Sequence, residues 1–163
     1  MVLTRLRGFR NHMLTILLLL VLSITQIALA QPQEKGCSIK ITKPVEGERI
    51  ETEAEVQGTA KVPAGRYLWT FARRKGLAIW WPQGGGSASI NRGGQWQVLV
   101  SLGSDRDERA VFEILALVVD ERANDALNAW VRRAEDTGRY PGMRLPAGVE
   151  GCNIAQVAVQ RLK

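Results

Sequence analysis

Apolar and polar residues alternate with a period of two in several parts of this chain, which is the pattern of a half-buried β-strand. In one such segment, Ile50, Ala54 and Val56 fall on one face while glutamates fall on the other. The segments that share this alternation are 37–42, 50–58, 67–72, 95–102 and 153–162. The sequence therefore predicts a mainly β protein.

Segment 111–119 differs because both of its faces are apolar, apart from Glu113. A strand that is apolar on both faces must be covered on both sides. The residues that follow can supply this cover, since apolar side chains recur there at the spacing of one helical stripe. The stripe consists of Ala123, Ala126, Leu127, Trp130 and Ala134.

Start and stop signals bound this helix. Asp120 can cap its first turn, and Gly138 with Pro141 can end it, so we predict a helix at about 121–136. Glycine- and proline-containing turns separate the other segments. Short strands at this spacing predict a two-sheet β-sandwich of about seven strands, with one α-helix inserted before the last strand.

The first thirty residues have the order of a secretory signal peptide: a basic head (Arg5, Arg7, Arg10), an apolar run over 13–22 and a small-x-small site at Ala28-Leu29-Ala30. We predict a signal peptide at 1–30, cleavage after Ala30, a short tail at 31–36 and a single domain at 37–163. The product would be exported, either periplasmic or extracellular. The alternative is an uncleaved membrane anchor, in which case the membrane would be a partner.

Removal of the signal peptide changes the chemistry that is available. The chain carries a net charge of +6 and one histidine, His12, and the predicted signal contains that histidine and three arginines. The exported part therefore has only a small positive charge, which is weak support for nucleic-acid binding, so we predict no nucleic-acid partner. Without histidine it has no Ser-His-Asp or Cys-His catalytic pair and no His-ligated metal site.

The chain has two cysteines, Cys37 and Cys152, near the two ends of the predicted domain. An even count so placed in an exported protein predicts one disulfide bond. The alternative is a pair of buried free thiols.

Several short motifs resemble the small immunoglobulin-like or fibronectin-like domains of bacterial surface and periplasmic proteins. The motifs are Ile41-Thr42-x-Pro44-Val45, Val56-x-Gly58-Thr59-Ala60, Trp69, Trp80-Trp81-Pro82-Gln83-Gly84-Gly85, Trp96-x-Val98, Leu102-Gly103 and Phe112-Glu113-Ile114. The resemblance implies an immunoglobulin-like β-sandwich and no particular activity. The cysteines lie at the chain ends, unlike the Cys-Trp-Cys core of immunoglobulin domains.

Two adjacent tryptophans, Trp80 and Trp81, precede a glycine loop and Gln83. Neighbours on a strand point to opposite faces, so we expect one indole to be buried and the other more exposed. An exposed indole beside Gln83 could stack on a sugar ring or anchor a partner protein. The alternative is that both indoles pack inside the domain.

Charged turns provide weaker candidates. Arg73, Arg74 and Lys75 form a basic hairpin that could meet an anionic surface or could be a solvated turn. Segment 104–108 has carboxylates that could bind Ca²⁺, yet its arginines favour local ion pairs, so we predict no metal site. Gly84–Ser87 lacks the lysine of a phosphate loop, so we predict no nucleotide and no other cofactor.

These observations favour a non-catalytic binding or interaction module outside the cytoplasm, with a protein or glycan of the cell envelope as partner. Its candidate contact residues are Trp80, Trp81, Gln83, Arg73, Arg74 and Lys75. One alternative is a small glycan hydrolase that uses paired carboxylates. The carboxylates available to it are Asp105, Asp107, Glu108, Glu113 and Asp120. A second alternative is a structural envelope protein.

Overall fold

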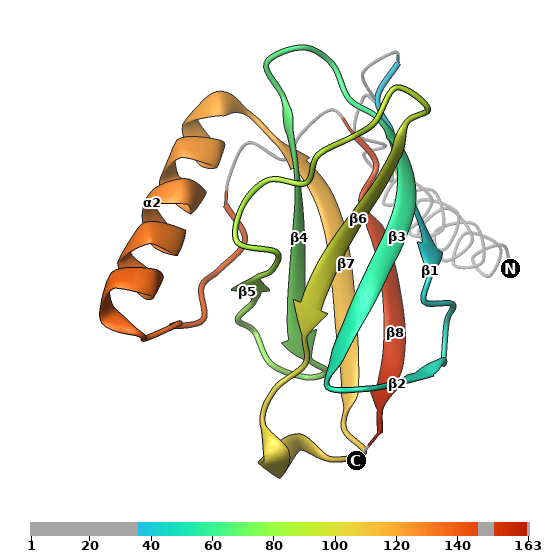
Figure 1. Cartoon of the computed structure of the whole chain (residues 1–163), viewed down its shortest axis with the longest axis vertical. Helices are drawn as coiled ribbons and strands as arrows, with labels where there is room; N and C mark the ends of the chain where they lie inside the picture. Colours follow the sequence, from blue (N-terminus) through green and yellow to red (C-terminus); the bar gives the residue numbers. More distant parts are fainter. Residues whose placement is uncertain (1–35, 147–151, 163) are drawn as a thin grey trace, which may run out of the picture. The chain divides into compact units, whose positions relative to one another are not determined.

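The computed structural model describes residues 36–146 and 152–162, and these residues form two β-sheets and one α-helix (Figure 1). The three-stranded sheet has the order β1 (Ser38–Lys43), β3 (Glu53–Lys61) and β6 (Gln95–Ser101). The five-stranded sheet has the order β2 (Arg49–Ile50), β8 (Ala155–Arg161), β7 (Val111–Val119), β4 (Tyr67–Arg74) and β5 (Trp81–Pro82). A short 3-10 turn, η1 (Asp105–Asp107), lies between β6 and β7, and helix α2 (Glu121–Thr137) lies between β7 and β8. The predicted signal peptide lies outside the described residues.

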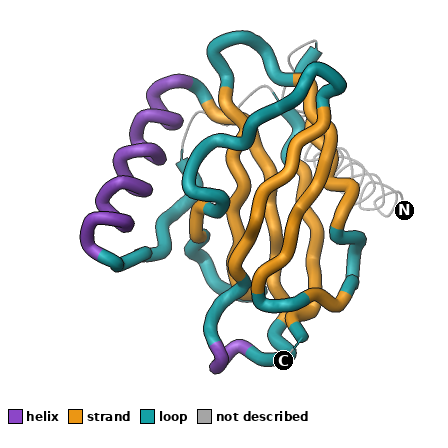
Figure 2. The backbone as a smooth tube through the Cα atoms, viewed as in Figure 1, coloured by secondary structure: helices purple, strands orange, loops and turns teal. Residues whose placement is uncertain are grey.

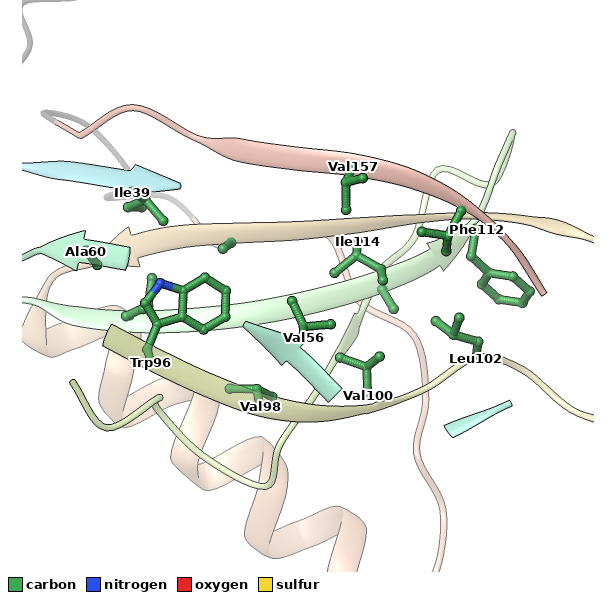
Figure 3. Packing of buried hydrophobic residues seen from close by; sticks show 14 of the residues in the cluster. Ile39, Val56, Ala60, Trp96, Val98, Val100, Leu102, Phe112, Ile114 and Val157 are labelled. Atoms are coloured by element: carbon green, nitrogen blue, oxygen red, sulfur yellow. The ribbon is translucent and has the colours of Figure 1, made fainter. Parts of the chain in front are cut away.

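The predicted fold class is confirmed: the domain is mainly β, with two sheets and a helix before the last strand. The inward faces of the two sheets form one hydrophobic core. Figure 3 shows side chains of β3 and β6 pointing toward those of β7 and β8. Trp96 lies over Gly58, its register partner on β3, where any side chain would collide with the indole. Gly58 therefore leaves room for the largest side chain of this core.

A second core lies on the other face of the five-stranded sheet, between β4, β7 and α2. Figure 2 shows the helix lying beside the strands rather than between the sheets. The prediction that the helix covers the second apolar face of 111–119 is confirmed, because Leu115, Leu117 and Val119 pack with Leu127 of α2. Strand β4 is covered on both faces as well. A buried hydrogen bond ties the helix to this strand, since Trp69 Nε1 donates to Asn124 Oδ1 over 3.0 Å.

The buried stripe of α2 differs from the predicted one. Ala123, Leu127 and Ala134 are buried as expected, but Val131 takes the place of Ala126, which is exposed. The contact follows the i, i+4 and i+8 row of Ala123, Leu127 and Val131, which packs in one cluster with residues of β4 and β7. Both helix ends are as predicted: Asp120 Oδ1 accepts a hydrogen bond from Ala123 N over 2.8 Å, and Gly138 ends the helix with a φ of 64°.

The strand predicted over 50–58 is wrong as a single element. Ile50 belongs to β2 and pairs in parallel with β8, whereas β3 of the other sheet begins at Glu53. The chain thus changes sheets at Glu51 and Thr52. It does so because Ile50 is buried and its carbonyl accepts a hydrogen bond from Leu162 N.

The first and last strands of the domain are joined covalently. Cys37 and Cys152 form the predicted disulfide, with their Cα atoms 5.2 Å apart. Beside it, the side chain of Asn153 makes two hydrogen bonds to the backbone of Ile39, at 2.9 and 2.7 Å. In the described part of the chain, no helix is long and apolar enough to cross a membrane.

Candidate binding groove

A groove with a volume of about 1180 Å³ lies where the outer strands of the two sheets meet the end of α2. One wall is the end of β6, at Leu99 and Ser101, and another is the end of β4 with its hairpin. Strand β5 and the segment that follows α2 complete it. Five of the six predicted contact residues line this groove: Trp81, Gln83, Arg73, Arg74 and Lys75.

Three aromatic side chains, Trp81, Trp130 and Tyr140, form what we call the aromatic shelf of the groove. The rings of Trp130 and Tyr140 meet edge to face, with centroids 6.2 Å apart. Trp81 Nε1 donates to Tyr140 O over 2.9 Å, and Trp130 Nε1 donates to Pro141 O over 3.2 Å. Since both indole N–H groups are used inside the domain, the shelf offers ring surface rather than donors to a ligand.

Trp80, the sixth predicted contact residue, lies in the second core and is only 5% exposed. Its backbone pairs in both directions with Met143, which attaches the segment after α2 to the sheet edge. The expected alternation is therefore present, with Trp80 buried and Trp81 partly exposed.

Arg73 is held in place by three contacts. Its guanidinium carbon lies 4.1 Å from the ring centroid of Trp80, Nε donates to Glu113 Oε2 over 2.6 Å, and one terminal nitrogen donates to Leu77 O over 2.9 Å. A cation over an indole face is attracted by the ring quadrupole. The charge of Arg73 is thus largely compensated inside the domain.

Gln83 connects the two sheets at the floor of the groove. Its backbone N–H donates to Thr70 O of β4, and its side-chain oxygen accepts from Ser101 N of β6 over 2.8 Å. Gly84 follows with a φ of 75°, and a Cβ there would lie 2.6 Å from a methyl group of Val98. The glycine allows the loop to lie directly against β6.

At the β4 end, Arg74 pairs with Asp107 at 3.2 Å, while Lys75 is exposed. A backbone hydrogen bond from Ser104 lowers the pKa of the Asp107 carboxyl, and Arg74 and Arg161 act in the same direction, against the opposing effect of partial burial. Asp107 thus acts as a fixed anion in the turn that closes this end of the groove.

Three of the five carboxylates proposed for a hydrolase have contacts within the domain. Glu113 pairs with Arg73, Asp107 with Arg74, and Asp120 caps α2. Within residues 36–146 and 152–162, no cluster of three or more His, Cys, Asp or Glu side chains could hold a metal ion.

The groove residues that sequence patterns missed include Trp130, Tyr140 and Leu99. Trp130 was assigned to the helix stripe, and Tyr140 follows the helix stop. Leu99 did carry a signal, because it is an apolar residue in the otherwise polar row of β6 and is 59% exposed. Two glutamines and Ser101 make up the rest of that row.

The chain has only a distant likeness to known proteins. No protein-family model and no curated protein sequence matches this chain. Among solved structures the chain is similar to the tandem Ig repeats of Dlar, with 13% identity and a TM-score of 0.30 over 81% of this chain. The match spans 47% of that structure. We draw no functional conclusion from a likeness of this degree.

Proposed function

We propose that this protein is a non-catalytic binding module that acts outside the cytoplasm and holds a protein segment or a glycan of the cell envelope in the groove. The observation that carries this proposal is the aromatic shelf. Its indole N–H groups are used internally, and its ring surfaces line a groove that also collects the residues predicted for binding. Exposed aromatic rings in a concave site are the usual anchors of both protein and small-molecule recognition.

Two further observations support the proposal. The disulfide indicates an oxidising, extracytoplasmic location. Three of the five carboxylates considered for hydrolysis, Glu113, Asp107 and Asp120, instead pair with arginines or cap the helix.

Tyr140→Ala tests the shelf without disturbing the fold. Tyr140 is 56% exposed, and its backbone carbonyl, which accepts from Trp81, remains after substitution. We expect about tenfold weaker retention of envelope-derived peptides or oligosaccharides on the immobilised protein, since one interface aromatic is often worth 1 to 2 kcal/mol or more.

Val45→Ala is the matched control, because Val45 is also an exposed apolar residue but lies outside the groove. Its retention should equal that of the unmodified protein. Equal retention by both variants would show that the shelf binds nothing, and the proposal would then fail.

A further inference from the structure

Strand β6 forms one wall of the groove, and most of its outer edge is covered. An antiparallel bridge between Ile90 and Trp96 covers the first part of this edge. Toward the end of the strand, Ser101 N donates to Gln83 Oε1 over 2.8 Å. The stretch between these contacts, around Leu99, is too short to hold an additional strand, since strands usually have at least about three residues. A peptide therefore has no site here at which it could extend the three-stranded sheet.

The outer edge of the five-stranded sheet is covered as well. The backbone of Trp80 pairs in both directions with Met143, at 2.7 and 2.8 Å. Pro82, in the edge strand β5, has no N–H to offer. Since neither sheet offers the groove a run of free edge within the described chain, its ligand must be recognised by side chains rather than by strand pairing.

The aromatic shelf offers ring faces rather than hydrogen-bond donors, because the indole N–H groups of Trp81 and Trp130 donate to backbone carbonyls at 2.9 and 3.2 Å. The amide of Gln83 is also used, since its nitrogen donates to Trp81 O and its oxygen accepts from Ser101 N. A peptide buried on this surface would leave main-chain N–H and C=O groups without partners, which is costly. The shelf therefore favours a ligand with an apolar face and with polar groups only around its perimeter.

A sugar ring has this distribution of groups. Its faces carry C–H groups, and its hydroxyl groups project from the perimeter. The C–H hydrogens carry a partial positive charge and are attracted to the electron-rich face of an aromatic ring, as ring edges are in aromatic pairs. A sugar stacked on Trp81, Trp130 or Tyr140 would therefore keep its hydroxyl groups free to reach other residues of the lining.

Three charged side chains of the lining are free to meet those hydroxyl groups: Lys75 after β4, Glu53 at the start of β3 and Glu135 on α2. All three are exposed, and none has a side-chain hydrogen bond or ion pair within residues 36–146 and 152–162. The other charged residues of the lining are paired. A carboxylate only accepts hydrogen bonds and an ammonium group only donates them, whereas a hydroxyl group does both. Hydroxyl groups can therefore pair with all three side chains.

The free side chains and the size of the groove restrict the ligand further. An anionic ligand would meet the carboxylates of Glu53 and Glu135, and a cationic one would meet Lys75, so an uncharged ligand fits best. The volume of about 1180 Å³ exceeds the range of about 300 to 1,000 Å³ that is usual for small-molecule sites. The groove therefore has room for more than one sugar ring.

We propose that the groove binds an uncharged oligosaccharide, whose rings lie on the aromatic shelf and whose hydroxyl groups bind Glu135, Glu53 and Lys75. The inference rests on the proposed function and assigns its ligand to the glycan class. Ring stacking supplies the apolar contact, and the free carboxylates and ammonium group supply the polar contacts that fix the orientation of the sugar.

Glu135→Ala tests the contact with hydroxyl groups, because alanine removes the acceptor and favours the helix. Asp136→Ala is the matched control, since Asp136 is the next residue of α2, is also exposed and lies outside the groove lining. The probes are three arrays: uncharged oligosaccharides of about two to six rings, anionic oligosaccharides of the same lengths and uncharged peptides of about ten residues.

We expect the protein to retain uncharged oligosaccharides and neither of the other probes. Glu135→Ala should weaken binding of the best oligosaccharide about fivefold or more, whereas Asp136→Ala should leave it unchanged. A higher salt concentration should have almost no effect on the affinity, because the ligand is uncharged.

Equal affinity of the two variants would overturn the inference, and so would a preference for anionic oligosaccharides. Retention of peptides alone that is lost in Tyr140→Ala would also overturn it, but would leave the binding module standing. If the protein retained no probe, the proposed function would fail together with this inference.

Singly deoxygenated forms of the best oligosaccharide give a test from the ligand side. At least one form should bind the unmodified protein about fivefold more weakly than the parent sugar, because it lacks the hydroxyl group that meets Glu135. The same form and the parent sugar should bind Glu135→Ala almost equally, since the acceptor is already missing there. Losses that are the same in both proteins for every form would contradict a contact between a ligand hydroxyl group and Glu135.

Discussion

Asp107 and Arg161 both bind Ser104 in the turn between β6 and β7. Asp107 accepts hydrogen bonds from the backbone and side chain of Ser104. Arg161, only 2% exposed, donates to Thr52 Oγ1 over 3.0 Å and to Ser104 O. A buried arginine without such acceptors would be strongly destabilising, so these contacts explain why a charged residue can end the last strand.

The depressed pKa of Asp107 predicts a pH-dependent stability. A carboxyl whose folded pKa is lowered stabilises the fold above its unfolded pKa of about 3.9 and loses this contribution as the pH falls through the folded value. Asp107→Asn should therefore lower the stability by about 1 kcal/mol at pH 7, the usual effect of losing a capping carboxylate. Thermal unfolding at pH 7, 5 and 3 should show the difference between the two proteins narrowing below pH 4.

Asp105→Asn serves as the control, because Asp105 lies in the same turn but is exposed. It should leave the melting temperature nearly unchanged. A deficit of Asp107→Asn that persisted undiminished at pH 3 would show that the charge of Asp107 does not stabilise the turn.

Among the secondary-structure elements, helix α2 supplies one side of the second core. Strands β4 and β7 present apolar residues on the face that the helix covers, and Leu127 is fully buried there. The hydrogen bond from Trp69 to Asn124 sets the position of the helix along the sheet, since a shift by one residue would leave both buried groups unpaired. The segment after α2 then brings the backbone carbonyl of Tyr140 to the Trp81 indole N–H and completes the groove.

Leu127→Ala should lower the free energy of unfolding by about 2 to 5 kcal/mol, because it removes a buried side chain and leaves a cavity between helix and sheet. Denaturant titration followed by tryptophan fluorescence measures this change. Arg132→Ala, on the exposed side of the same helix, should change it by less than about 0.5 kcal/mol. Similar values for both variants would mean that the helix does not depend on this core.

For the molecule as a whole, the disulfide joins the start of β1 to the strand that follows the helix. The two cysteines are 115 residues apart, so the bond closes almost the entire domain into one loop. On the chain-entropy account, closing a loop of this length lowers the conformational entropy of the unfolded chain. This stabilises the folded protein by about 4 to 5 kcal/mol.

Reduction, or the double change Cys37→Ser and Cys152→Ser, should lower the stability by up to about 4 to 5 kcal/mol. The measurement is denaturant unfolding with and without a reductant. The double variant should be insensitive to the reductant, which separates loss of the bond from other effects of the reagent. Unchanged stability of the reduced protein would show that native contacts alone hold the chain ends together.

Local pattern was enough to predict much of the fold. The strand over 111–119, its double coverage, the helix after it and the caps at Asp120 and Gly138 all depend on neighbouring residues along the chain. The sheet change at Glu51 and Thr52 could not be predicted in this way, because the alternation continues through it. Only pairing of Ile50 with β8 separates the two strands.

The residues of the groove also fall into those that local sequence predicted and those that it did not. A cluster of tryptophan, glutamine and glycine identified Trp81 and Gln83, since those residues are adjacent in sequence. Tyr140 and Leu99 reach them only through packing, one from the segment after α2 and the other from the far sheet. The sequence by itself thus determined which segments are strands or helix, because hydrophobic periodicity is local. Tertiary structure alone decided the shape of the groove and which residues line it, because contacts between distant elements depend on how the two cores pack.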